Sequence, residues 1–320
     1  MQSITLRSGL ERKSALSVAC AALKLQIRAL AFPHLTRGWL NLLNSHGTLR
    51  ELAQSQPRLI HKIYRPYLSN RLDRGERLAA LVAHYRFVLQ HGLGAAMLQA
   101  ARGRLELASF AGKSGEMYYI DLRAIVPLER EGEMVLQLRC GQALVYSVAF
   151  SFLTERRQAS IGVGCLQGPQ CGDGLALARE ATRDLHGLRP KQLLLRLVHQ
   201  LGHAYGCERM LLVGNGNRAV RKQMRKGKVM ADYDAFWREL GARPRADGDF
   251  ELDCLPLQEP DMEQIPSRKR SEARKRHALL SELVDSVIGA LRQSPARPAL
   301  VLAEAPPAQQ RDNSSYAAAA

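Results

Sequence analysis

The spacing of apolar positions divides the chain into segments of different predicted structure. Across residues 13–101, apolar side chains recur every three to four positions, which is typical of amphipathic helices. The clearest stretch follows Asp73 or Asn70, either of which can cap a first helical turn, and contains Leu78, Leu81, Val82, Tyr85, Val88 and Leu89. We therefore predict a helical N-terminal region.

Near residue 103 the helical period gives way to strict alternation. In the best example, apolar aromatic and branched residues alternate with smaller ones, at Tyr146, Val148, Phe150 and Phe152. Such alternation is typical of strands. Similar runs predict five strands, over Arg104–Phe110, Glu116–Ile125, Glu133–Cys140, Ala143–Leu153 and Gln158–Leu166. Because the breaks at Gly132 and Gly141 are short, we expect an antiparallel meander.

After residue 170, helical and extended patterns follow one another. We predict helices over Gly174–His186, Pro190–Tyr205 and Tyr233–Leu240, and strands over Arg209–Val213 and Asp249–Leu255. A run of strands followed by a helix–strand–helix–strand order indicates a mixed α+β fold, not an alternating Rossmann pattern. The domain organisation that we expect is a helical N-terminal region (1–102), an α/β domain (103–258), an amphipathic C-terminal helix (259–294) and a disordered tail (295–320).

Charge is distributed unevenly over these regions. The net charge is +16, but residues 111–266 carry 21 Lys/Arg against 20 Asp/Glu, whereas residues 1–110 carry 16 against 5 and residues 267–320 carry 9 against 5. Basic flanks favour an anionic partner: nucleic acid, a membrane surface or a phosphorylated ligand. Aromatic residues are only 6% of the chain and do not interleave with the basic segments, which disfavours a stacking nucleic-acid reader.

The N-terminal segment has two interpretations. Basic residues precede the apolar stretch Ala15–Leu23, as in a signal peptide, but Lys24 and Arg28 stand where a cleavage site would be. We interpret residues 13–31 as a basic amphipathic helix. Since no apolar run reaches the ~18–20 residues of a membrane span, the expected location is cytoplasmic.

Cysteine and histidine spacing argues against a metal site. The six cysteines are scattered without a CxxC pair, which favours reduced thiols. His199 and His203 share a helix face, but no third ligand is identifiable. We therefore predict no metal.

Several segments are candidates for binding an anion. His186–Lys191 enters a helix, where phosphate binding competes with a plain turn that has Pro190 at the first helical position. The string GVGCLQG at Gly162–Gly168 echoes a phosphate loop but is better interpreted as a bulged strand. Two basic clusters are candidates for contact with an anion or a membrane. One contains Arg221, Lys222 and Arg225, and the other contains Arg268, Lys269 and Arg270. The alternative is that both are solvated surface.

Taken together, several strings resemble those of the VirK/YbjX family of Gram-negative bacteria. They span roughly residues 35–292 and include Pro66-Tyr67-Leu68, the strand LVYSVAFSF at Leu144–Phe152, Leu166-Gln167-Gly168, His186–Lys191 (HGLRPK), Tyr233–Gly241 (YDAFWRELG) and Pro266–Arg270. The resemblance implies a protein of the cytoplasm or peripheral at the inner membrane, with a role in virulence, envelope stress and antimicrobial-peptide resistance. It transfers no catalytic residue.

The predicted element order is also similar to that of GNAT-like acyltransferases. That likeness implies acyl-CoA as cofactor, with a binding site formed by Gln167, Gly168, Gly187, Arg189, Lys191 and Gln192. The sequence departs from the GNAT pattern, because an extra helix, Gly174–His186, precedes the entry to the next helix and the entry has a single glycine.

Two functional hypotheses follow. One is a GNAT-like acyltransferase acting on an envelope component or its precursor; its catalytic residues are not identifiable from the sequence. The other is a non-enzymatic adaptor that docks on an anionic membrane surface. Nucleic-acid binding is a weaker third hypothesis, because no reader fold is recognisable.

Overall fold

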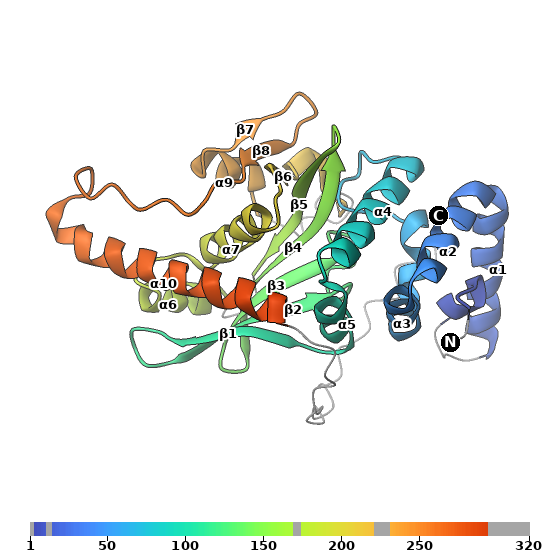
Figure 1. Cartoon of the computed structure of the whole chain (residues 1–320), viewed down its shortest axis with the longest axis horizontal. Helices are drawn as coiled ribbons and strands as arrows, with labels where there is room; N and C mark the ends of the chain where they lie inside the picture. The colour runs from blue at the N-terminus through green and yellow to red at the C-terminus, as the bar shows by residue number, and fades with distance from the viewer. Residues whose placement is uncertain (1–2, 11–14, 169–173, 221–230, 294–320) are drawn as a thin grey trace.

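The computed structural model describes residues 3–10, 15–168, 174–220 and 231–293. Its N-terminal part is helical, as the sequence predicts (Figure 1). The Asp73 carboxylate accepts a hydrogen bond from the Glu76 N–H (2.8 Å), and Glu76 accepts one from the Asp73 N–H (2.8 Å). This capping box makes Asp73, not Asn70, the cap of α4. The elements are η1 (Leu6–Gly9), α1 (Ala15–Ala31), α2 (Pro33–Ser45), α3 (Gly47–Ser55), η2 (Pro57–Tyr64), α4 (Arg74–Gln90) and α5 (Gly94–Arg102).

Eight strands form one sheet in the order β1-β2-β3-β4-β5-β6-β8-β7. The first five make the expected antiparallel meander, β5 and β6 pair in parallel, and β8 returns antiparallel to β6. The two-residue strand β7 was not expected from the sequence. The strands are β1 (Leu105–Ala111), β2 (Met117–Ala124), β3 (Met134–Cys140), β4 (Ala143–Glu155), β5 (Gln158–Gln167), β6 (Arg209–Leu212), β7 (Arg243–Pro244) and β8 (Phe250–Asp253).

The remaining helices follow β5 and pack around the sheet. They are α6 (Gly174–Asp184), α7 (Pro190–Ala204), the short η3 (Asn215–Asn217), α9 (Tyr233–Glu239) and α10 (Ser267–Gln293). In Figure 1, α7 crosses in front of β4 and β5, and α10 lies across α7 towards β1. The molecule is therefore a mixed α+β fold with a mostly antiparallel sheet and flanking helices. The meander and the helix–strand–helix–strand order that follows it are those expected from the sequence.

Helix α4 lies beside the part of β4 that extends past β3. Pairing between β3 and β4 stops at Met134 and Phe150. Two residues further along β4, the Phe152 N–H donates to Nδ1 of His84 on α4 (3.1 Å). His84 is fully buried, and burial, helped by the charge of Lys62, lowers its pKa to about 3. The neutral imidazole therefore accepts from a β4 N–H at a position beyond the end of the β3 pairing.

A buried ion pair fixes the helical region to the sheet. The fully buried carboxylate of Glu133 accepts hydrogen bonds from the Lys62 ammonium and the Tyr85 hydroxyl. The Glu133 N–H donates to Ser151 Oγ (3.0 Å), which also hydrogen-bonds the Tyr67 hydroxyl (2.7 Å). We call these residues the Glu133 cluster. Apolar residues of both regions belong to one continuous core, and the boundary at residue 102 stays a prediction.

Candidate functional site

Strand β5 separates from β6 at Gly164. Parallel pairing covers only Ser160–Val163, and one further bond runs from the Val213 N–H to the Val163 carbonyl (3.1 Å). Strand β5 itself continues along β4 to Gln167. The end of β5 therefore has an edge that β6 does not cover.

Gly164 is the extra residue of a β-bulge at this separation. Its neighbours Val163 and Cys165 pair with consecutive residues of β4, so Gly164 itself has no partner there. A Cβ on Gly164 would lie 2.1 Å from the Glu131 carbonyl oxygen, and only glycine permits such an approach. The interpretation of this glycine-containing string as a bulged, closely packed strand is confirmed.

Tyr233, the first residue of α9, closes the free edge of β5. Its hydroxyl accepts a hydrogen bond from the Leu166 N–H (2.7 Å) and donates to the Leu166 carbonyl (2.6 Å). The Arg218 guanidinium lies over the Tyr233 ring, 3.8 Å from its centroid, and donates to the hydroxyl (3.1 Å). A ligand that pairs with this edge would have to displace a single phenol.

The Glu131 carboxyl lies in the same buried cluster. Burial raises its pKa to about 6, although the Arg218 charge and the Cys165 thiol favour the ionised form. Burial also raises the pKa of Cys165 to about 12 and that of Tyr233 well above its ordinary value, so both keep their protons at neutral pH. These four residues, the Glu131 cluster, combine one group that titrates near neutral pH, two proton donors and a guanidinium.

The predicted anion site at the start of α7 is joined to α9. The Arg189 guanidinium forms an ion pair with Glu239, and Gln192 Nε2 donates to the same carboxylate (3.3 Å). Lys191 Nζ lies 3.9 Å from the centroid of the Phe236 ring. Burial and the charge of Arg189 lower the pKa of Lys191. Of the two cations, Arg189 is paired with a half-exposed carboxylate and Lys191 lies over an aromatic ring, so an anion would neutralise the excess positive charge.

The other three residues expected at the cofactor site are the last residue of β5 and two glycines. Gly187 has a φ of +78° in the turn that leads into α7. Gln167 ends β5, and Gly168 packs so closely that a Cβ would lie 3.1 Å from the Tyr146 ring. The structure therefore brings Arg189 and Gln192 to the Glu239 carboxylate and Lys191 to the Phe236 ring of the same helix, and the six-residue cofactor site stays a prediction.

The first turn of α7 offers few backbone groups to an anion. Pro190 has no N–H, and the N–H groups of Gln192 and Leu193 both donate to the Arg189 carbonyl (2.8 and 3.0 Å). Among the first residues of α7, that leaves the N–H of Lys191. The side chains at α7 fit the diphosphate of an acyl-CoA by their charge, whereas the backbone does not form the N–H cradle of a glycine-rich phosphate loop.

Of the two predicted basic clusters, the structure describes the one at the start of α10. Arg221, Lys222 and Arg225 lie outside the described residues. At the start of α10, Arg268 and Lys269 are exposed, and Arg270 Nε donates to a backbone carbonyl, that of residue 265 (2.9 Å). The apolar side of α10 is buried, through Ala273, Leu280, Leu283, Val287 and Leu291. These α10 cations therefore have no exposed apolar face of their own helix beside them.

An exposed apolar stripe runs along α1. Leu16, Leu23, Ile27 and Leu30 are between 56% and 80% exposed, whereas Leu25 on another side of the helix is buried. The stripe follows helical spacing, and α1 lies at the edge of the molecule (Figure 1).

Within the described residues no single helix has the length and composition of a membrane span. Helices α1 and α2 together have that length and composition, but the chain bends by 110° between them.

His199 and His203 hold strand β8 in place. The ring of His199 hydrogen-bonds through Nε2 to the Asp253 carbonyl (2.8 Å), and His203 Nδ1 lies 3.2 Å from the Cys254 carbonyl. Across the part of the chain that the structure describes, no three His, Cys, Asp or Glu side chains are placed to hold a metal ion. The two histidines thus serve packing between α7 and β8.

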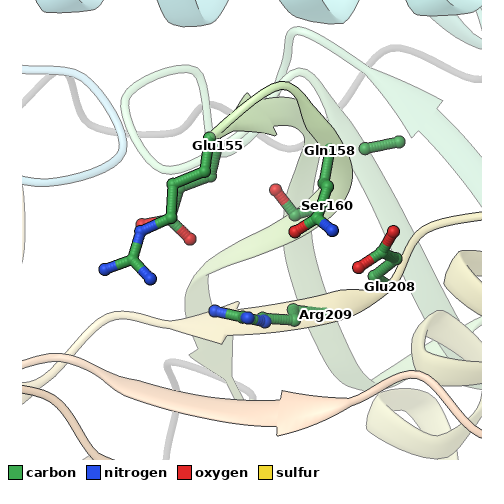
Figure 2. A pocket seen from close by; sticks show the side chains of 7 residues that line it. Glu155, Gln158, Ser160, Glu208 and Arg209 are labelled. Atoms are coloured by element: carbon green, nitrogen blue, oxygen red, sulfur yellow. The ribbon is translucent and has the colours of Figure 1, made fainter.

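A small pocket opens at the turn between β4 and β5. Figure 2 shows Glu155 on one side and Gln158, Ser160, Glu208 and Arg209 around the opening. Its volume is about 10 Å³, which is enough for roughly one water molecule. This pocket is too small to be a substrate site.

The Glu131 cluster was not identified from the sequence. Glu131 is a single carboxylate in a loop, and Cys165 lies in an apolar strand, so neither has a motif around it. Tyr233 lies in a string that marks the family resemblance, and Arg218 borders a basic segment. The one usable signal was the glycine spacing at Gly164, which indicates a bulge but not what lies against it.

Comparisons with known proteins give relatives without an established activity. The chain is 29% identical to the uncharacterized protein YbjX of Escherichia coli K12 over 266 residues, which is 81% of this chain and 80% of that protein. It is 25% identical to an uncharacterized protein of Haemophilus influenzae over 247 residues, covering 76% of this chain and 81% of the relative.

Two solved structures match the chain distantly. Two variants of a cAMP-binding acyltransferase from Mycobacterium smegmatis match with TM-scores of 0.27 and 0.29 at 14% and 15% identity, over 67% and 68% of this chain and 63% and 61% of theirs. At these scores the matches carry no argument about activity.

The comparison with protein families identifies the family of the chain. Residues 16–288 match the family described as "Protein of unknown function (DUF535)". The chain belongs to the DUF535 family.

Proposed function

We propose that the protein is an acyltransferase whose reaction site is the separation of β5 from β6. The observation that carries this proposal is the bulge at Gly164 with the Glu131 cluster beside it. An acyl thioester such as acyl-CoA supplies the activated acyl group. The acceptor suggested by the family resemblance is an envelope component or its precursor.

The residues of the cluster have protonation states that suit acyl transfer. A carboxyl with a pKa of about 6 is largely ionised at pH 7 and can accept a proton from an attacking nucleophile. The Tyr233 hydroxyl holds its proton and can donate it to a leaving group, while Arg218 orients the ring. Because the pKa of Cys165 is about 12, its thiol is a proton donor here, not a thiolate nucleophile.

Helix α9 connects the cluster to the cations that would hold the anionic end of the donor. Tyr233 begins this helix, and Phe236 and Glu239, further along it, contact Lys191 and Arg189. An incoming diphosphate can replace Glu239 as the partner of Arg189, because exposed ion pairs contribute little stability.

Thermal unfolding in the presence of acetyl-CoA and decanoyl-CoA tests the proposal. Binding at a hundred times Kd stabilises the native state by about 2.7 kcal/mol, so we expect a clear rise in Tm at millimolar ligand. The rise should disappear in the double variant Arg189→Gln/Lys191→Gln. The matched control is Arg268→Gln/Lys269→Gln, which removes two exposed cations from α10. No stabilisation by any acyl-CoA would contradict the proposal.

We also propose that α1 docks the protein on anionic membrane. Its exposed stripe of four large apolar residues lies on a helix that contains Lys24 and Arg28 and no carboxylate. A basic helix with an outward apolar face suits the lipid interface. The absence of carboxylates disfavours self-association through the same face, since like charges would meet.

Co-sedimentation with vesicles tests this second function. Binding to vesicles rich in phosphatidylglycerol should exceed binding to phosphatidylcholine and weaken with salt. Leu23→Gln/Ile27→Gln should abolish it, whereas Leu175→Gln/Leu255→Gln, which changes two exposed leucines elsewhere, should not. Equal binding by both double variants would rule out docking through α1.

A further inference from the structure

A cavity separate from the Glu131 cluster lies between α4, the β4–β6 part of the sheet and the turn that joins β7 to β8. Its volume is about 450 Å³, and it is partly open to solvent. That volume is within the range of small-molecule sites. No comparison and no part of the proposed function accounts for it.

Small side chains keep this cavity open. On α4, Ala79, Ala80 and Ala83 line it where larger residues would fill it. Opposite them lies Gly162, where a Cβ would approach Leu153 Cδ1 to 2.6 Å. Most of the apolar wall comes from Leu68, Leu72, Leu153, Leu211, Leu212 and Val213. The interior therefore suits an alkyl or aryl group.

The charged residues that line the cavity are mostly acidic. Four carboxylates, Glu76, Glu155, Asp247 and Asp249, face a single cation, Arg245. Arg245 already forms ion pairs with Glu155 and Asp247. In a chain of net charge +16, this local excess of negative charge is unusual.

Two of the four carboxylates have no cation within ion-pair distance among the described residues. Asp249 accepts hydrogen bonds only from uncharged groups, the Gly214 N–H (2.9 Å) and Asn217 Nδ2 (2.8 Å). Glu76 accepts from the Asp73 N–H (2.8 Å). The charge of Arg71 acts to lower the pKa of Asp249, but the Arg71 guanidinium donates to a backbone carbonyl, that of residue 247. Asp249 is partly buried, whereas Glu76 is exposed at the mouth of the cavity. A carboxylate without an ion-pair partner attracts a cation from solution, and more strongly where it is partly buried.

From this arrangement we infer that the cavity binds a small amphiphilic amine, with its apolar body against the leucines and Gly162 and its ammonium group between Glu76 and Asp249. The inference is independent of acyl transfer, because the site shares no residue with the Glu131 cluster or with the α7 cations. Recognition is by charge and apolar burial together.

Isothermal titration calorimetry with three eight-carbon probes tests this inference. The probes are n-octylamine, 1-octanol and n-octanoate, which share the apolar chain and differ in head-group charge. We expect n-octylamine to bind at least about tenfold more tightly than 1-octanol, a difference of about 1.4 kcal/mol, and n-octanoate to bind most weakly. Equal affinity for the three probes would overturn the assignment of an amine.

Variants separate the apolar and the acidic parts of the site. Ala80→Leu fills the cavity and should abolish binding of n-octylamine, and Ala83→Val gives a second, milder filling should the first variant fold poorly. Glu76→Gln/Asp249→Asn should weaken n-octylamine about tenfold and leave 1-octanol unchanged. The control Glu116→Gln/Glu272→Gln removes two exposed carboxylates elsewhere. Binding that survives both cavity-filling variants would place the ligand outside this cavity and contradict the inference.

Discussion

Glu131 and Glu133 are two residues apart and both buried, but their surroundings differ in kind. The Glu133 carboxylate has a cation and a phenol bonded to it and is fully buried. The Glu131 carboxyl has a guanidinium and a thiol in its surroundings, is 8% exposed, and has a pKa of about 6. A carboxylate with a full set of partners fixes a structure, whereas one with a near-neutral pKa can exchange a proton.

Among the variants that follow, we expect the largest loss of stability from substitutions in the Glu133 cluster. Removing one member of a buried ion pair leaves the other charge uncompensated, which costs about 3–5 kcal/mol. We expect Lys62→Met to lower the free energy of unfolding in urea by that amount. The double variant Lys62→Met/Glu133→Leu should recover a large part of it. A loss below about 1 kcal/mol for Lys62→Met would show that the pair does not hold the helices on the sheet.

The next largest effect is expected at the bulge. Gly164→Ala places a Cβ against the Glu131 carbonyl oxygen at 2.1 Å, so the backbone must move, at a cost of about 1–3 kcal/mol. Gly289→Ala is the matched control, because nothing lies within 4 Å of that position in α10 and alanine is the better helix former. Thermal unfolding of the two variants measures the difference. Equal stability would mean that the bulge is not tightly packed.

Ionisation of Glu131 should lower the free energy of unfolding by an amount that depends on pH. Its pKa is raised from 4.5 to about 6 on folding, so the native state binds the proton more tightly. Below pH 4.5 the carboxyl is protonated in both states and carries no penalty; above pH 6 it is ionised in both, and the penalty reaches about 2 kcal/mol.

Urea unfolding of wild type and Glu131→Gln between pH 4 and 8 measures this penalty. The stability of wild type relative to the variant should fall as pH rises through this window and then level off. Glu116→Gln, at an exposed carboxylate, should give a flat difference. A flat difference for Glu131→Gln as well would contradict the raised pKa.

The smallest effect is expected at the start of α7. Glu239→Gln removes the partner of Arg189, but the pair is exposed on both sides, so stability should change by less than about 1 kcal/mol. Binding of acyl-CoA should strengthen, because the variant no longer competes for Arg189. Calorimetric titration with acetyl-CoA measures this change, and weaker binding would argue against diphosphate at this position.

The sequence predicted the elements better than it predicted the site. Periodicity identified the meander and α7, because each buries one regular face, and it identified the basic helix α1, whose apolar stripe has the same helical spacing but is exposed. Strand β7 was missed because two residues carry no period.

The site required contacts between distant segments. Arg189 meets Glu239 fifty residues away, and Glu131 reaches β5 only because Gly164 has no side chain. Neither contact leaves a local pattern. The glycine spacing indicated the bulge, but the groups packed against it come from three other parts of the chain.

The central claim is that Glu131 is the titrating group of a site that accepts an acyl thioester. The most direct measurement is a carbon-13 NMR titration of the Glu131 carboxyl, assigned with Glu131→Gln, in the absence and presence of acetyl-CoA. The account predicts a pKa of about 6 in the free protein and a changed pKa when acetyl-CoA binds. An ordinary glutamate pKa that acetyl-CoA leaves unmoved would contradict it.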